Sequence, residues 1–189
     1  MSAVSTLAPR LAQALHSFGD SLTLRSEVVA DFAFIAELYA EVRNDVLAPV
    51  PWPEQAKRDF LSAQCRLQRD HYAKHYVGAE FLVVERMTER SSDPIGRIYA
   101  HAARAEIRLM DIALLSESRG RGIGTVLVRA LQDVATQRGV DLTLHVEPEN
   151  PAQRLYQRLG FTLIENRGVY DFLGWSPCAA TIESQGPIS

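Results

Sequence analysis

The chain has 189 residues, of which 47% are hydrophobic and 23% charged, and its formal net charge at pH 7 is -3. This length fits one domain with a substantial core, and the composition is that of an ordinary soluble globular protein. The weak negative charge argues against nucleic-acid binding, and no apolar run approaches the ~20 residues that span a bilayer. The two cysteines, Cys65 and Cys178, lie far apart, and the start resembles no secretory signal, so we expect a cytoplasmic protein.

The first third of the chain predicts helices with one strand between them. Apolar residues at helical spacing predict a helix over 7–18, and a strand begins over 21–25. Asp31 is the expected N-cap of the next helix. Three prolines around position 51 then break the chain, and a long helix is expected over 53–76.

The middle of the chain changes to short apolar segments typical of strands. Segments 81–85 and 95–102 predict an antiparallel hairpin with a long loop, in which 91–94 forms a turn. Segment 107–115 is apolar nearly throughout, which indicates a central strand. A glycine-rich turn follows it.

Helices and strands then alternate. In chain order we expect a helix from Ile123 that Gly139 ends, a strand over 140–146, a helix from Asn150–Pro151 to Gly160, and strands over 161–164 and 169–175. The predicted fold is α/β, of the layered α+β kind, with a mixed sheet of about six to seven strands and helices on both faces. The domain is expected over 21–175, with a helical extension over 1–20 and a loose tail over 176–189.

The turn after the central strand carries the clearest chemical pattern, Arg119-Gly120-Arg121-Gly122-Ile123-Gly124-Thr125. Glycines let a ligand approach the backbone, whose N–H groups can converge on an anion with those of the following helix. The arginines add positive charge and the threonine a hydroxyl. The spacing fits neither the dinucleotide motif nor the P-loop. A phosphate site and a plain glycine turn with surface arginines both stay open on this pattern alone.

Two longer segments resemble one family. Segment 111–124 resembles motif A of the GNAT superfamily of acyl-CoA N-acyltransferases, with Arg119, Gly122 and Gly124 at its fixed positions. Segment 150–161, Asn-Pro-Ala-Gln-Arg-Leu-Tyr-Gln-Arg-Leu-Gly-Phe, resembles motif B, and departs from it slightly in placing an alanine directly after the proline. The resemblance implies a single GNAT-like domain whose sheet splays between its fourth and fifth strands, with acetyl-CoA as co-substrate in the gap.

The resemblance also implies roles for individual residues. The backbone of Ala113, Leu114 and Leu115 would pair with the pantetheine arm, and the turn 119–125 would hold the pyrophosphate. Asn150 would lie near the pantetheine, a role compatible with its capping of a helix. Tyr156 matches the tyrosine that protonates the departing thiolate, for which its ordinary pKa of about 10 is suitable. A packed aromatic residue is the alternative for Tyr156.

The general base stays open among three residues. His145 and Glu147 alternate away from the apolar face of the strand 140–146, and a histidine titrates near neutrality. Asp111 is a polar residue within an apolar strand. A satisfied structural polar group is an equal alternative for each of them.

The hypothesis is therefore direct transfer of an acetyl group to a primary amine in a ternary complex, without a metal or a covalent intermediate. His71 and His75 have a spacing that can bind metal, but a solvated helix face is favoured over a metal site. A non-catalytic acyl-CoA sensor of the same fold is the alternative. The acceptor, a small-molecule or protein amine, is not identified, and a donor with a longer acyl chain and a homodimer stay open.

Overall fold

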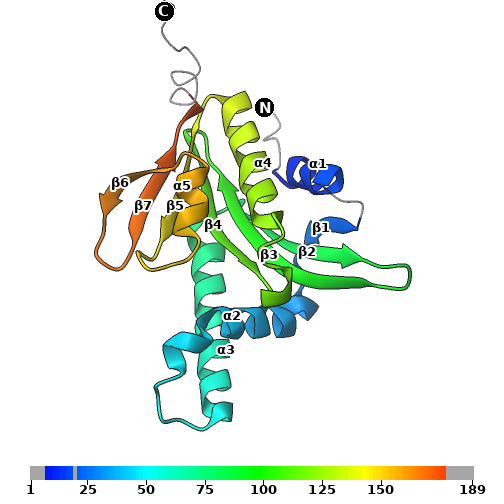
Figure 1. Cartoon of the computed structure of the whole chain (residues 1–189), viewed down its shortest axis with the longest axis vertical. Helices are drawn as coiled ribbons and strands as arrows, with labels where there is room; N and C mark the ends of the chain where they lie inside the picture. The colour runs from blue at the N-terminus through cyan, green and yellow to red at the C-terminus, as the bar shows by residue number, and fades with distance from the viewer. Residues whose placement is uncertain (1–6, 19–20, 178–189) are drawn as a thin grey trace, which may run out of the picture.

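A single seven-stranded sheet organises the chain, with strand order β1-β2-β3-β4-β5-β7-β6. The computed structural model describes residues 7–18 and 21–177. In chain order its elements are α1 (Ala8–Phe18), β1 (Leu22–Ser26), η1 (Val29–Asp31), α2 (Phe32–Leu47), α3 (Glu54–His75), β2 (Glu80–Met87), β3 (Ser92–Ala102), β4 (Glu106–Leu114), η2 (Ser116–Ser118), α4 (Ile123–Arg138), β5 (Asp141–Val146), α5 (Gln153–Arg158), β6 (Thr162–Asn166) and β7 (Asp171–Trp175) (Figure 1).

The sheet is mixed, as the sequence predicts. Neighbouring strands pair antiparallel except β4 and β5, which pair parallel and are joined through α4. This β4–α4–β5 unit is the expected strand–helix–strand crossover. Its helix ends where predicted, because Gly139 adopts a left-handed φ of 62° and its N–H donates to the last turn of α4.

Helices cover both faces of the sheet (Figure 1). The larger core joins α1, α4 and α5 to one face, and Leu11 and Leu15 of α1, with Leu7 just before it, are fully buried in it. The smaller core joins α2 and α3 to the other face around Ile35, Cys65 and neighbouring apolar residues. The predicted helix stripe over 7–18 is thus part of the main core.

Two local predictions were wrong. The β2–β3 loop is short, because β3 begins at Ser92, inside the predicted turn, and the Ser92 hydroxyl donates to Glu85 of β2 at 2.7 Å. Asp31 precedes α2 as expected, but its carboxylate does not cap the helix. It accepts instead from the Val28 N–H and from both terminal nitrogens of Arg25, so it fixes the preceding turn.

Near the C-terminus, α5 begins at Gln153, three residues after the predicted start. The Asn150 side chain still organises this turn, because its Oδ1 accepts from the Ala152 N–H at 2.9 Å. Cys178 and the predicted tail, apart from Ser176 and Pro177, lie outside the described residues. No helix in the described part of the chain is long and apolar enough to cross a membrane.

Candidate active site

The β4 and β5 strands part halfway along β4. Their pairing runs from Glu106 opposite Asp141 to Leu109 opposite Leu144, whereas β4 continues to Leu114 beside β3. A bulge lies at the point of separation, since Tyr99 and Ala100 of β3 pair with Asp111 and Leu109 and leave Met110 as an extra residue. The Tyr72 hydroxyl of α3 donates to the Met110 carbonyl at 3.1 Å and so supports the bulge. The splay that the resemblance implies is present at this position.

The glycine-rich turn lies at the C-terminal end of the parted half of β4. Gly120 and Gly122 have left-handed φ values of 71° and 86°, which favour glycine. Helical bonding in α4 begins when the Val126 N–H donates to the Gly122 carbonyl at 3.0 Å. The N–H groups of Ile123, Gly124 and Thr125 precede that bond, which is the arrangement that binds anions at helix N-termini.

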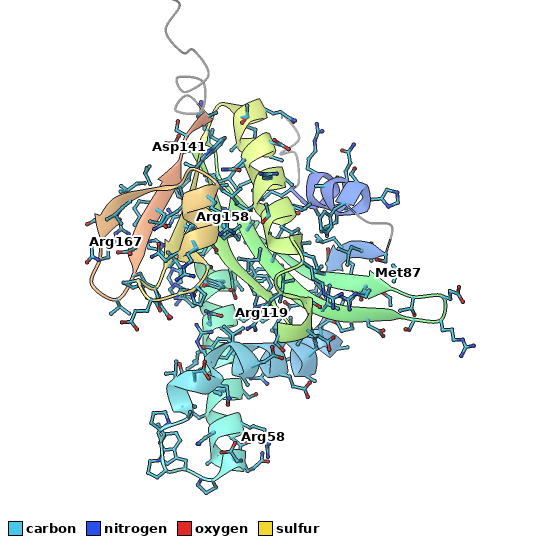
Figure 2. All side chains as sticks on the ribbon, in the orientation of Figure 1. Arg58, Met87, Arg119, Asp141, Arg158 and Arg167 are labelled. Atoms are coloured by element: carbon cyan, nitrogen blue, oxygen red, sulfur yellow. The ribbon has the colours of Figure 1, made fainter. Side chains whose placement is uncertain are left out.

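The side chains around the turn differ in whether they are free to contact a ligand. Arg121 is exposed, whereas the Ile123 side chain is buried, so that residue offers only its backbone. Arg119 lies between α2 and the start of α4, where it donates to the Leu114 carbonyl at 2.7 Å and to Glu41 at 3.1 Å (Figure 2). Its guanidinium is thus engaged with protein acceptors.

The predicted pantetheine segment follows the free side of β4 only in part. Ala113 and Leu114 lie in the parted half of the strand, without a partner residue in β5. The Leu115 N–H instead donates to the Ile95 carbonyl of β3 at 2.9 Å. Leu115 therefore directs its N–H away from the space between β4 and β5.

Tyr156 of α5 is 5% exposed and contacts the Phe161 ring edge to face, with centroids 5.6 Å apart. It belongs to the core on the α4 side of the sheet. Burial raises the pKa of Tyr156, and the nearby Asp111 carboxylate raises it further. Both effects keep the phenol protonated, as a proton donor requires.

Asp111 lies on the opposite face, the one that α3 covers. Cross-strand partners share a face, and Tyr99 pairs with Asp111. Arg97, two residues before Tyr99 and paired with Ala113, therefore lies on the same face as Asp111. Asp111 forms an ion pair with Arg97, whose side chain is 2% exposed, whereas 19% of the Asp111 side chain is exposed. Burial and then Asp111 raise the pKa of Tyr72, so this carboxylate acts on tyrosines on both sides of the sheet.

His145 lies between two arginines on the same face as Asp111. Its Nδ1 is 3.2 Å from Arg108 of β4, and its Nε2 is 3.1 Å from Arg167, while its ring stacks on Phe172 of β7 at 4.9 Å. Partial burial against these neighbours lowers the pKa of His145, and Arg108 and Arg167 lower it further. Glu147, the third candidate base, is exposed beyond the end of β5.

A family model described as "Acetyltransferase (GNAT) family" matches residues 36–161. The chain belongs to this family. A comparison with curated protein sequences found no match.

Solved GNAT structures share the fold. The PaiA N-acetyltransferase from Thermoplasma acidophilum, in complex with coenzyme A, is 18% identical with a TM-score of 0.61, over 82% of this chain and 99% of that one. A phosphinothricin acetyltransferase from Sinorhizobium meliloti, in complex with acetyl-CoA, is 26% identical with a TM-score of 0.52, over 82% and 88%. Arabidopsis thaliana Naa50, in complex with a bisubstrate analogue, is 17% identical with a TM-score of 0.50, over 82% and 99%.

Three polar partners on the α3 face of this GNAT chain were not among the residues predicted from the sequence. They are Arg97, which pairs with Asp111, and Arg108 and Arg167, which flank His145. Arg97 and Arg108 stand within mainly apolar strands, the same signal that drew attention to Asp111. Arg167 carries no such signal, because it lies in the turn between β6 and β7.

Proposed function

We propose that this GNAT protein binds acetyl-CoA between β4 and β5 and transfers its acetyl group directly to a primary amine. The observation that carries the proposal is the loss of β4–β5 pairing after Leu109, directly before a turn with two left-handed glycines and a helix N-terminus. A strand with one free side can bond an extended pantetheine arm, and the turn can bind the pyrophosphate. The coenzyme A and acetyl-CoA complexes of two structural relatives support this assignment.

The cofactor contacts follow from the availability of each group. The N–H groups of the segment 120–125 bind the pyrophosphate, and Arg119 and Arg121 add charge. To bind the pyrophosphate, Arg119 must give up its hydrogen bond to Glu41. The two negative charges of the pyrophosphate favour this exchange of partners. Pantetheine contacts fall to the Leu114 N–H, since Leu115 and, by strand alternation, Ala113 direct their N–H groups toward β3. Asn150 holds the turn before α5 and would contact the pantetheine arm.

In the chemical step, the amine nitrogen attacks the thioester carbonyl, a C–N bond forms, and the C–S bond then breaks. Tyr156 donates its proton to the departing thiolate, giving free CoA thiol. Its raised pKa favours the protonated form before transfer. The amine loses a proton to a base on the acceptor's side of the sheet.

Asp111 is the favoured base among the three candidates. Its partly exposed carboxylate lies at the bulge where the strands part, and Arg97 keeps it in place. His145 is less suitable, because each of its ring nitrogens already faces an arginine. Glu147 lies farther along, past the last residue of β5.

Release of CoA thiol from acetyl-CoA, measured with a panel of primary amines, tests the function. We expect steady, amine-dependent release by the full chain and loss of most of it in Tyr156→Phe. Binding of acetyl-CoA without release with any amine would instead identify the protein as an acyl-CoA sensor. The same assay with longer acyl-CoA donors establishes the donor's chain length.

A further inference from the structure

Two strands and a turn bring a compact polar cluster together on the α3 face, beside the point where β4 and β5 part. Arg108 pairs with Thr143 one residue before the last β4–β5 pair, and His145 is the first residue of β5 beyond that pair. Arg167 reaches the cluster from the β6–β7 turn (Figure 2). We call Arg108, His145 and Arg167 the imidazole–arginine cluster.

The cluster holds more hydrogen-bond donors than acceptors. A neutral imidazole has one N–H and one lone pair, so His145 can accept from only one of the two arginines that approach its two nitrogens. At the other nitrogen, a donor faces a donor. The Arg108 Nε is buried and has no hydrogen-bond partner among the described residues. A buried donor without a partner is costly, and Arg97 and Arg138 each contain one as well.

Two glutamates accept some of the hydrogen bonds that the cluster's arginines donate. Glu106 accepts from Arg108 at 2.8 Å and also from the Thr143 hydroxyl, and Glu165 accepts from Arg167 at 2.7 Å. Their charges balance the two arginines, and both act to raise the pKa of His145, but the net direction remains downward. The excess of donors persists after these ion pairs are counted, because neither glutamate accepts from the Arg108 Nε and each ring nitrogen of His145 still faces an arginine.

We propose that the imidazole–arginine cluster binds an anionic group of the acceptor, a carboxylate, phosphonate or phosphate. The preferred acceptors are then small amines that also carry a negative charge. Such a group brings two or three acceptor oxygens to the donors around the exposed His145 and Arg167, and guanidinium groups bind it with charge-assisted bonds. This inference rests on the proposed acetyl transfer, which places the amine near Asp111.

The two binding points have a defined spacing. Arg108 and Asp111 lie on the same face of β4, three residues apart across the bulge, roughly 10 Å along the strand. The arginine side chain can bridge much of that distance. A series of ω-amino carboxylic acids therefore measures the spacing directly, because the optimal chain length reports the separation between amine and anion.

The test compares each ω-amino carboxylic acid with the n-alkylamine of the same length, and includes ω-aminoalkyl phosphonates to distinguish the anion's chemistry. The readout is the ratio of kcat/KM for the acid to kcat/KM for the alkylamine. We expect a ratio well above one in the wild-type protein and a fall of about 10- to 100-fold in Arg108→Gln and in Arg167→Gln. Arg104→Gln, which removes an exposed arginine between β3 and β4, is the matched control and should leave the ratio unchanged.

A ratio near one in the wild-type protein, or an unaltered ratio in both cluster variants, overturns the proposal. Binding without turnover is followed by NMR of the histidine ring signals during titration with the same acids. A shift of the His145 signals by the acids, absent with alkylamines and lost in Arg108→Gln, supports the anion site even if no amine releases CoA. No shift with millimolar acid contradicts the anion site, whatever the outcome for acetyl transfer.

Discussion

The two halves of β4 carry different polar clusters on the same face of the sheet. In the half that parts from β5, the buried Arg97 forms an ion pair with the Asp111 carboxylate. Its guanidinium also donates to the Gln68 amide oxygen at 3.2 Å. In the half that pairs with β5, Arg108 meets His145 at 3.2 Å and Glu106 at 2.8 Å. The buried Nε of both Arg97 and Arg108 has no hydrogen-bond partner among the described residues. Both clusters contain a strand arginine, but only the first has a charge partner with little solvent access.

This difference indicates which polar groups hold the fold and which are left for a ligand. Removal of Arg97 leaves a carboxylate without its charge partner in a largely buried place. Removal of Arg108 leaves Glu106, whose side chain is 35% exposed, and the exposed His145, both of which water can reach. A strand arginine is thus structural or ligand-binding according to how far solvent can reach it and its charge partner.

The largest expected effect is the difference between Arg97 and Arg108 in their contribution to the free energy of unfolding. Arg97→Met should lower the free energy of unfolding by about 3 kcal/mol, because Asp111 loses its partner. Arg108→Met should lower it by less than about 1 kcal/mol, because its partner Glu106 is partly exposed and water can replace the arginine. Denaturant unfolding measures both. Adding Asp111→Asn to Arg97→Met should cost little more, and equal losses in the two arginine variants would remove the distinction.

The second prediction concerns the gap where β4 and β5 part. Tyr156→Phe removes the proposed proton donor without changing the packed ring, so kcat should fall about 100-fold. The Kd for acetyl-CoA should stay within about twofold, because the hydroxyl acts on the departing sulfur and not on the nucleotide. Tyr170→Phe, at an exposed tyrosine before β7, is the control. Full activity of Tyr156→Phe would exclude the hydroxyl from the reaction.

The third prediction tests the turn that follows the parted half. Gly122→Ala forces a side chain into a left-handed φ of 86°, which costs roughly 1–2 kcal/mol, and its Cβ would lie 3.2 Å from the Phe18 ring. Acetyl-CoA affinity should fall about tenfold. Gly78→Ala is a matched control, since Gly78 has φ of 85° and open space around it, far along the chain from the turn. Equal affinity losses in both variants would indicate general strain.

The smallest effect is on the titration of His145. Its pKa lies below the ordinary 6.5, through partial burial and then Arg108 and Arg167, so Arg108→Gln should raise the NMR midpoint. The unfolded chain then takes up the proton at higher pH than the folded one. This residue's contribution to stability is therefore complete above pH 6.5 and declines as the pH falls toward the folded midpoint. A wild-type midpoint above 6.5 would contradict the contacts described for the ring.

Local patterns predicted the frame of the site well. The apolar segment 107–115, the glycines after it and the helix that Gly139 ends indicated the β4–α4–β5 unit. The turn at Asn150 was also visible, although α5 begins three residues later. These features depend on residues close together in the chain.

The imidazole–arginine cluster could not be predicted, because it depends on distant pairings. His145 meets Phe172 only because β7 inserts between β5 and β6, and Arg167 arrives from the turn beyond β6. The bulge at Met110 likewise follows from the register between β3 and β4. Neither register nor strand order is set by a pattern within one segment.

Calorimetric titration of the full chain with acetyl-CoA tests the central claim, that the parted strands and the glycine turn form a cofactor site. We predict saturable binding of one acetyl-CoA per chain, weakened in Gly122→Ala and retained in Gly78→Ala and Tyr156→Phe. Absence of binding at millimolar acetyl-CoA would contradict the claim.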